Sequence, residues 1–285
     1  MAKGVFYKPE TAPYLNPTLD RRVVLITGGD TGIGWFTILH LYLHGYVIYL
    51  AGLSTEGVSK AFIDLQDEAQ RRVDLYSEKE KAERHLGILH HIKIDLADLD
   101  SVVEAADEFF TKESRLHTLI WHAGVAESEV ERTKDGFEKH MQVNFLSQFL
   151  LYLKLLPALE NVVDDRKVPR VVLVSTVVHH LVTKHYKPQN DINSFSASYN
   201  SLMSYLRSKV SQIQLAKYLN RTKPEILFIS VNPGTVFHST FYDNWKALKS
   251  IGLIIKGFFS AFDATGVTNE EGSISTLRAV MDPNL

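Results

Sequence analysis

The sequence predicts an α/β fold in which one doubly wound parallel sheet forms a single domain. Three observations support this prediction: short β-branched apolar runs, longer helical patterns between them, and a glycine-rich turn directly after the first run. Continuous apolar runs bounded by turn residues are typical of strands buried on both faces of a sheet. Their regular alternation with helical patterns indicates right-handed βαβ units and therefore parallel strands.

The predicted strands share β-branched and aromatic composition, and they cover residues 22–27, 46–51, 91–95, 118–121, 170–175 and 226–231. Helical patterns lie between them at 33–44, 54–84, 133–156 and 196–219. Gly45 is expected to end the first helix. The charge run in the second helix is expected to be a solvated face. Thr268 and Glu271 have the spacing of a capping box, which should open the last helix.

Composition excludes several classes of function. The chain has 285 residues with a formal net charge of -2, and no basic stripe stands out, so a nucleic-acid partner is not expected. The absence of cysteine excludes disulfides, a thiolate nucleophile and thiolate metal sites, and it fits a reducing compartment. We therefore expect a cytoplasmic protein.

The first predicted strand runs directly into the sequence TGGDTGIG, and a helix follows. Glycines allow a sharp turn and a close approach to a pyrophosphate, and the helix N-terminus offers free N–H groups to the phosphates. The position between strand and helix is the context that distinguishes such a turn from an ordinary glycine turn. The sequence thus predicts dinucleotide binding by residues Thr27, Gly28, Gly29, Asp30, Thr31, Gly32, Ile33 and Gly34.

Tyr205 and Lys209 are four residues apart in a predicted helix, so their side chains should share one helix face. A free tyrosine has a pKa near ~10, and a neighbouring ammonium lowers that pKa because it favours the phenolate. The lysine also carries donors that can bind a ribose. This pairing points to a tyrosine that exchanges protons at neutral pH.

The TGxxxGxG turn and the Tyr-x-x-x-Lys pair together resemble the short-chain dehydrogenase/reductase family. The pattern is most similar to retinol-dehydrogenase-like and WW-domain-oxidoreductase-like members and to fungal carbonyl reductases. The resemblance implies a Rossmann fold. It also implies catalytic roles for Tyr205 as proton donor, Lys209 beside it, Thr176 as the hydroxyl that holds the substrate oxygen, and Asn144 as the holder of a relay water. Ser175 is the alternative to Thr176.

The resemblance also extends the expected cofactor site beyond the glycine turn and the catalytic pair. Asp95 and Leu96 correspond to the family's adenine-contacting pair, and Thr240 would touch the cofactor amide. The remaining expected contacts are Leu53, Ser54, Ala123, Gly124, Pro233, Gly234 and Thr235.

The chain departs from the family pattern in several places. Trp121 and His122 stand where the family has two asparagines, which affects fine positioning, and we assign His122 no catalytic role. The second strand ends without an acidic residue that would repel a 2′-phosphate, and Leu53 offers no charge. We therefore favour NADP over NAD. The family's seventh strand is missing: either the chain is truncated or the sheet edge is completed differently.

The implied activity is an NAD(P)H-dependent interconversion of a carbonyl, expected to be lipophilic, and an alcohol. The alternative is a catalytically weak cofactor-binding sensor or scaffold, which the departures at Trp121 and His122 motivate. A sugar-nucleotide epimerase shares the fold, but Trp35 argues against it. No metal is expected, since the pair His179 and His180 has no third ligand nearby.

The expected organisation is an extended leader at residues 1–20 and one dinucleotide-binding and catalytic domain at 21–285. A substrate loop is expected at about 177–200 and a lid at about 237–265. The apolar stretch 251–262 is too short to span a bilayer, and Lys256 interrupts it. It is either a buried lid helix or an interfacial helix resting on a membrane or lipid droplet. A homodimer is a further alternative to a monomer.

Overall fold

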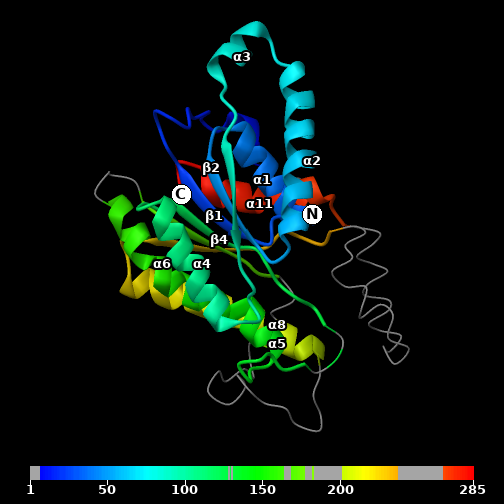
Figure 1. Ribbon diagram of the computed structural model, residues 1–285, viewed down its shortest axis with the longest axis vertical. Coiled ribbons are helices and arrows are strands. Elements are labelled where there is room, and N and C mark those ends of the chain that lie inside the picture. The colour runs from blue at the N-terminus through cyan, green and yellow to red at the C-terminus, as the bar shows by residue number, and fades with distance from the viewer. Residues whose placement is uncertain are drawn as a thin grey trace.

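In the computed structural model the described residues are 7–127, 129, 131–163, 168–176, 182, 201–236 and 266–285. Within them, six parallel strands form one sheet in the order β3-β2-β1-β4-β5-β6, with helices on both faces (Figure 1). The strands are β1 (Val23–Thr27), β2 (Val47–Gly52), β3 (Ile88–Lys93), β4 (Thr118–Trp121), β5 (Arg170–Val174) and β6 (Leu227–Val231). The predicted fold class is confirmed. The strand order reverses between β1 and β4, and such a switch point opens a crevice at the carboxyl ends of the strands.

Two layers of helices cover the sheet (Figure 1). One layer contains α1 (Gly32–Leu43), α2 (Thr55–Asp74) and α11 (Asn269–Met281), and the other contains α4 (Leu99–Lys112), α6 (Ser147–Val163) and α8 (Ser201–Thr222). Shorter elements are η1 (Pro9–Thr11), α3 (Glu78–Glu83), α5 (Lys139–Met141) and a π-helical turn, η2 (Gln142–Leu146). The capping box expected at Thr268 and Glu271 is present and opens α11.

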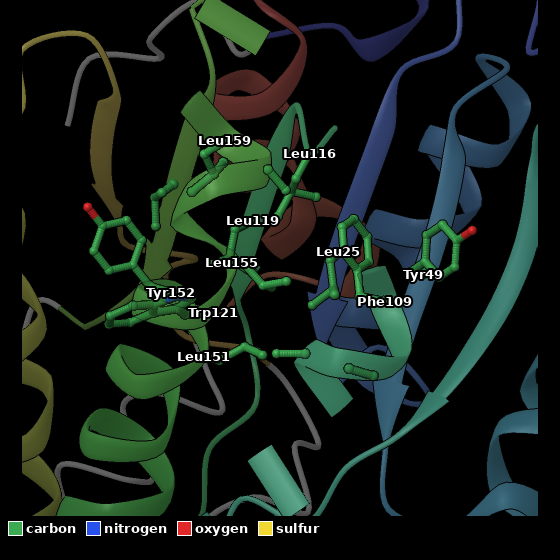
Figure 2. Close-up of a cluster of buried hydrophobic side chains, with 14 of the residues drawn as sticks. Leu25, Tyr49, Phe109, Leu116, Leu119, Trp121, Leu151, Tyr152, Leu155 and Leu159 are labelled. Carbon is green, nitrogen blue, oxygen red and sulfur yellow. The ribbon is translucent and has the colours of Figure 1, made fainter. Parts of the chain in front are cut away.

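Each layer packs its own hydrophobic core against one face of the sheet. Successive strand residues point to opposite faces, so Leu25 belongs to the core under α4, α6 and α8, whereas Ile26 belongs to the core under α1, α2 and α11. Figure 2 shows the first of these cores, which includes Trp121 and Tyr152. The four inner strands β1, β2, β4 and β5 are buried on both faces, which is why their sequences are largely apolar.

The long helix predicted for 54–84 is divided into α2 and α3. The Ser77 hydroxyl accepts a hydrogen bond from the N–H of Glu80, and the Glu80 carboxylate accepts one from the N–H of Ser77. This capping box starts a new helix, so the single helix that the polar pattern suggested is interrupted.

The helix predicted for 133–156 begins later than expected. Gly136 has a φ of +83° and forms a turn in which the N–H of Thr133 donates to the carbonyl of Phe137. The left-handed conformation at Gly136 cannot continue a helix. The chain therefore enters α5, then the π-helical turn, and only then α6.

Residues 7–20 differ from the extended leader that was expected. Pro9 lies in the 3-10 helix η1, and Pro9, Ala12 and Pro17 are buried. Ala12 joins the core under α1 and α11. The N–H of Leu15 donates to the carbonyl of His44 at the end of α1. The prolines of this segment shape a packed turn.

The outer edge of β6 carries no strand within the described residues. There the side chain of Asn220 from α8 pairs with the backbone of Phe228. Its Oδ1 accepts from the N–H at 3.0 Å and its Nδ2 donates to the carbonyl at 2.8 Å. A single asparagine thus pairs with the N–H and carbonyl of Phe228, two of the outward-facing backbone groups that a further strand would bind.

Candidate active site

The glycine turn joins β1 to α1 with little room behind it. Gly28 has a φ of +66°, and a Cβ there would lie 2.5 Å from the Cα of Ala123. A Cβ on Gly34 would lie 2.9 Å from the Cα of Gly29 and within contact distance of the carbonyl oxygen of Gly28. Gly32, with a φ of +58°, would meet only the Oδ1 of Asn269, at 3.7 Å. The turn is closed toward the protein and open at the N-terminus of α1, an arrangement that suits a pyrophosphate.

Thr27 ties this turn to the segment after β4. Its hydroxyl oxygen is buried and accepts from the N–H groups of His122 and Ala123, each at 3.2 Å. Gln148 of α6 adds a third donor, its Nε2, at 3.0 Å. Thr27 therefore holds the two sides of the crevice in a fixed register.

The residues expected on the adenine side of the cofactor gather at the carboxyl ends of β2 and β3. Leu53 is exposed, and the Ser54 hydroxyl caps α2 by accepting from the N–H of Gly57. The Asp95 carboxylate accepts from the N–H of Ala97, and the carbonyl of Leu96 accepts from the Ser147 hydroxyl. A cavity of about 490 Å³ opens here, lined by Leu53, Lys93, Asp95, Asp98, Ser101, Glu104 and Glu108.

Tyr205 and Lys209 lie on one face of α8, as their spacing predicted. Both are buried, and the Lys209 Nζ lies 5.8 Å from the centre of the Tyr205 ring. The Nζ also donates to the carbonyl of Val174 at 2.8 Å, which fixes it at the end of β5. Burial lowers the pKa of Lys209 to about 8. The spacing alone is not unique, because Tyr242 and Lys246 repeat it outside the described residues.

The two candidate hydroxyls after β5 differ in what they contact. The Ser175 hydroxyl is buried and donates to the carbonyl of Lys209 at 3.1 Å. Thr176 is half-buried. Both line a cavity of about 390 Å³ between α8 and β6, together with Ile213, Ala216, Lys217, Asn220, Phe228, Ser230, Val231 and Asn232.

Asn144 sits in the π-helical turn and is fully buried. Its Oδ1 accepts from the N–H of Val125 at 2.7 Å, and its Nδ2 donates to the Val125 carbonyl and to the Ser208 hydroxyl, each at 3.1 Å. Its backbone carbonyl accepts from the Nε2 of Gln212 at 2.7 Å. Asn144 therefore clamps the loop after β4 to α8, and only second lone pairs on its oxygens are left for a relay water.

Two residues of the site carry no signal in the sequence. Gln212 is one, because nothing marks it as the partner of Asn144. His140 is the other: its ring packs edge-on against Tyr205 with centroids 6.3 Å apart. The Nδ1 of His140 contacts the Glu138 carboxylate at 2.7 Å, and its Nε2 accepts from the N–H of Glu127 at 2.9 Å. Only the fold reveals that this fixed, buried imidazole supports Tyr205.

The segment after β6 carries Pro233, Gly234 and Thr235. Gly234 has a φ of +81°, and the carbonyl of Thr235 accepts from the N–H of Val267 at 2.7 Å. The other expected features of this side lie outside the described residues: His179, His180, Thr240, the apolar stretch 251–262, and nearly all of the expected substrate loop.

A model of the short chain dehydrogenase family matches residues 22–242, which include the glycine turn, Asn144 and the Tyr205–Lys209 pair. The chain belongs to this family. It is thus an oxidoreductase of the short-chain dehydrogenase type, a family that depends in general on NAD(P). The glycine turn and the donor groups beside it fit such a cofactor.

Similar proteins cover most of the chain. An uncharacterized oxidoreductase of Schizosaccharomyces pombe is 31% identical over 94% of this chain and 75% of that protein. Retinol dehydrogenase 11 of Mus musculus is 30% identical over 95% and 76%, respectively. A Shigella flexneri short chain dehydrogenase complexed with NADP has a TM-score of 0.64 at 16% identity, with 94% of each chain covered, which supports the fold alone.

No helix among the described residues is both long and apolar enough to cross a membrane. No group of three or more histidine or acidic side chains in the same residues could hold a metal ion.

Proposed function

We propose that this short-chain dehydrogenase interconverts a lipophilic carbonyl compound and its alcohol, with Tyr205 as the general acid and base. The observation that carries the proposal is the buried Lys209 ammonium beside the Tyr205 ring at the carboxyl end of β5. An ammonium in a buried site favours the phenolate strongly, because the local dielectric is low. A Cβ on Gly124 would lie 3.5 Å from the Lys209 Nζ, and a Cβ on Gly28 would lie 2.5 Å from the Cα of Ala123, so one loop connects the pair with the glycine turn.

The hydroxyl that holds the substrate oxygen is proposed to be that of Thr176. The Ser175 hydroxyl is buried and already donates a hydrogen bond to the Lys209 carbonyl. Thr176 is half-buried and lies two residues after Val174, whose carbonyl accepts a hydrogen bond from the Lys209 ammonium. A hydroxyl in this position can stabilise negative charge that develops on the substrate oxygen.

The residues that would hold the dinucleotide are those of the glycine turn, with Lys209 binding the ribose. When bound, the nicotinamide supplies or accepts a hydride. In the reductive direction, Thr176 orients the carbonyl oxygen and Tyr205 gives it a proton. Lys209 keeps the pKa of Tyr205 low, while Asn144 fixes the loop that carries Ala123 and Gly124. A lipophilic substrate is in line with relatives named retinol dehydrogenase 11 and polyprenol dehydrogenase.

The proposed activity is tested by incubating the purified protein with NADPH and a panel of ketones and aldehydes that range from polar to long-chain. We expect oxidation of NADPH and formation of the alcohol, with kcat/KM rising with apolar length. Dinucleotide binding without turnover on the whole panel would instead support the sensor or scaffold alternative.

We propose NADP(H) as the preferred cofactor. Lys93 would supply the positive charge that pairs with the 2′-phosphate, since Leu53 is uncharged. Lys93 is the register partner of Gly52, the residue before Leu53, and both line the same cavity. Asp95, Glu104 and Glu108 line that cavity as well and would repel a 2′-phosphate. Binding of a 2′-phosphate in this cavity therefore depends on the charge of Lys93.

Replacing Lys93 with glutamine is expected to weaken NADPH binding about fivefold, in line with a partly exposed ion pair of ~1 kcal/mol. NADH lacks the 2′-phosphate, so its affinity should not change and serves as the control. Titration calorimetry of both cofactors checks the result. An equal loss for NADH and NADPH would contradict the assignment of Lys93.

The depressed pKa of Lys209 predicts the pH dependence of reduction. Below pH 8 the lysine is charged and lowers the pKa of Tyr205, and above pH 8 that charge is lost. We therefore expect kcat/KM to be flat below pH 8 and to fall about tenfold per pH unit above it. A profile that rises steadily through pH 8 to 9 would argue against this role.

The lowered pKa of Lys209 also affects the free energy of unfolding, in the direction opposite to its effect on kcat/KM. The folded pKa lies below the value of about 10.4 for an unfolded lysine. Between these two values the unfolded chain binds more protons, so the contribution of Lys209 to the free energy of unfolding rises with pH in that window. Activity and this stability term thus move in opposite directions.

A further inference from the structure

The short helix α5 lies against α8, the helix that carries Tyr205 (Figure 1). His140 of α5 is fully buried, and its ring meets the Tyr205 ring edge-on at 73°, with the ring centroids 6.3 Å apart. This separation is within the range of favourable aromatic pairs. The apolar side chains Ala126 and Met141 pack in the same cluster as Tyr205. An imidazole is polar, so its burial among these side chains requires hydrogen-bond partners.

Both ring nitrogens of His140 have such partners. The Nε2 accepts a hydrogen bond from the backbone N–H of Glu127 at 2.9 Å, so it carries no proton. The Nδ1 lies 2.7 Å from the Oε1 of Glu138 and therefore donates to that carboxylate. The two contacts together define one tautomer, the neutral ring with its proton on Nδ1. A second proton would have to displace the N–H of Glu127, so these contacts hold the ring neutral.

Glu138 uses both of its carboxylate oxygens to fix this arrangement. Its side chain is buried, and while Oε1 accepts from His140, Oε2 accepts from the N–H of Met141 at 2.9 Å. A glutamine has one carbonyl oxygen and would present its NH₂ group to one of these two donors, whereas a carboxylate accepts from both. A buried network in which every member is satisfied is rigid and specifies one arrangement. The Glu138–His140 pair is therefore fixed before any ligand binds.

The Glu138–His140 pair is also tied to the start of α8. The carbonyl of Glu127, whose N–H binds His140, accepts a hydrogen bond from the Ser201 hydroxyl. Ser201 is the first residue of α8 and lies about one helical turn before Tyr205. The pair thus contacts the ring of Tyr205 and, through Glu127, fixes the helical turn that precedes it. None of these contacts involves the glycine turn.

We propose that His140, held by Glu138, is a positioning residue that sets the direction of the Tyr205 hydroxyl for proton transfer. The inference rests on the proposed function, in which Tyr205 is the general acid and base. A tyrosine side chain can change rotamer, and it transfers a proton only when its hydroxyl lies within hydrogen-bond distance of the substrate oxygen. The fixed imidazole restricts the ring of Tyr205 from one side, and the Glu138 carboxylate fixes the imidazole. This role is separate from binding of the dinucleotide.

The first test compares turnover with cofactor affinity in His140→Phe, which keeps an aromatic ring but loses both hydrogen bonds. We expect kcat for carbonyl reduction to fall about tenfold, less than the loss of about 100-fold that a 1 Å misplacement can cause. The affinity for NADPH should stay within about twofold. The solvent deuterium isotope effect on kcat should rise, because proton transfer becomes slower. Glu138→Gln leaves the imidazole in place and should show the same changes to a smaller extent.

His44→Phe is the matched control. His44 is another buried imidazole, which stacks on Tyr14 with ring centroids 4.2 Å apart, and its Nδ1 is bound to the carbonyl of His40 at 2.7 Å. It lies at the end of α1, in the helix layer on the opposite face of the sheet from α8. The variant keeps a ring and loses a buried hydrogen bond, so it should lower Tm and leave kcat unchanged.

A second test observes Tyr205 directly and needs no turnover. In protein with isotope-labelled tyrosine rings, the nuclear magnetic resonance signal that disappears in Tyr205→Phe belongs to Tyr205. We expect one sharp signal in the parent and in His44→Phe. In Glu138→Gln the same signal should broaden or split, because the imidazole beside the ring is no longer held in one orientation.

Three outcomes would overturn the inference. The first is an unchanged kcat in folded His140→Phe, or in Glu138→Gln if His140→Phe does not fold. The second is an equal loss of kcat and NADPH affinity, which would mean that the pair positions the cofactor. The third is an unchanged Tyr205 signal in Glu138→Gln. A parent protein without turnover would contradict the proposed function itself, whereas the signal of Tyr205 would still decide whether the Glu138–His140 pair positions its ring.

Discussion

Replacing Tyr205 with phenylalanine is expected to lower kcat/KM for carbonyl reduction by about 10²–10⁴-fold, the range that a positioned general acid contributes. The phenyl ring preserves the packing against His140 and Met141, since only the hydroxyl is lost. Lys209 and the glycine turn stay in place, so the affinity for NADPH should remain within about twofold. Steady-state kinetics with the best substrate of the panel, together with calorimetric binding, checks both parts.

Tyr218→Phe provides the matched control. Tyr218 lies on the same helix, α8, but its side chain is largely exposed. Its hydroxyl is remote from the crevice, and its removal should leave turnover unchanged. Retention of most activity in Tyr205→Phe would mean that another group donates the proton, and the mechanism would have to be assigned anew.

Replacing Gly34 with alanine is expected to weaken dinucleotide binding at least about 100-fold. The added Cβ would lie 2.9 Å from the Cα of Gly29 and against the carbonyl of Gly28, and neither backbone atom can yield without moving the turn. The backbone is tightly packed here, so the turn must move to admit the methyl group. A misplacement of about 1 Å can lower a reaction rate about 100-fold, and we expect a loss of similar size in affinity. Binding is measured by titration calorimetry, and folding by circular dichroism.

Gly136→Ala controls for general destabilisation. Gly136 has a left-handed φ, and a Cβ there would meet no atom of the described residues within 4 Å, so alanine should cost roughly 1 kcal/mol of stability. Its affinity for the dinucleotide should be that of the parent. If Gly34→Ala bound NADPH normally, the glycine turn would not be the phosphate site.

The sequence predicted the sheet because its four inner strands are buried on both faces and are therefore largely apolar. It predicted the glycine turn and the Tyr205–Lys209 pair because both depend on local spacing. Element boundaries were less accurate: β3 was expected at 91–95 and lies at Ile88–Lys93. The side chains of β3 are only half-buried at this edge of the sheet, so the pattern of apolar residues does not define where the strand begins and ends.

The contacts that complete the candidate site could not be predicted, because they join residues far apart in the chain. The clamp of Asn144 on Val125 depends on a π-helical turn that no local pattern announces. The choice between Ser175 and Thr176 depends on the carbonyl of Lys209, which only the packing of α8 against β5 brings close.

The pairing of Asn220 with Phe228 has a consequence for colloidal behaviour. An exposed strand edge is a template on which other chains can stack and grow into insoluble assemblies. Here a helix side chain already occupies the donor and acceptor of Phe228, so an incoming strand must first displace two hydrogen bonds. At Phe228 one amide therefore makes the outer edge of β6 a poorer template for strand addition, an effect that is independent of catalysis and of the cofactor.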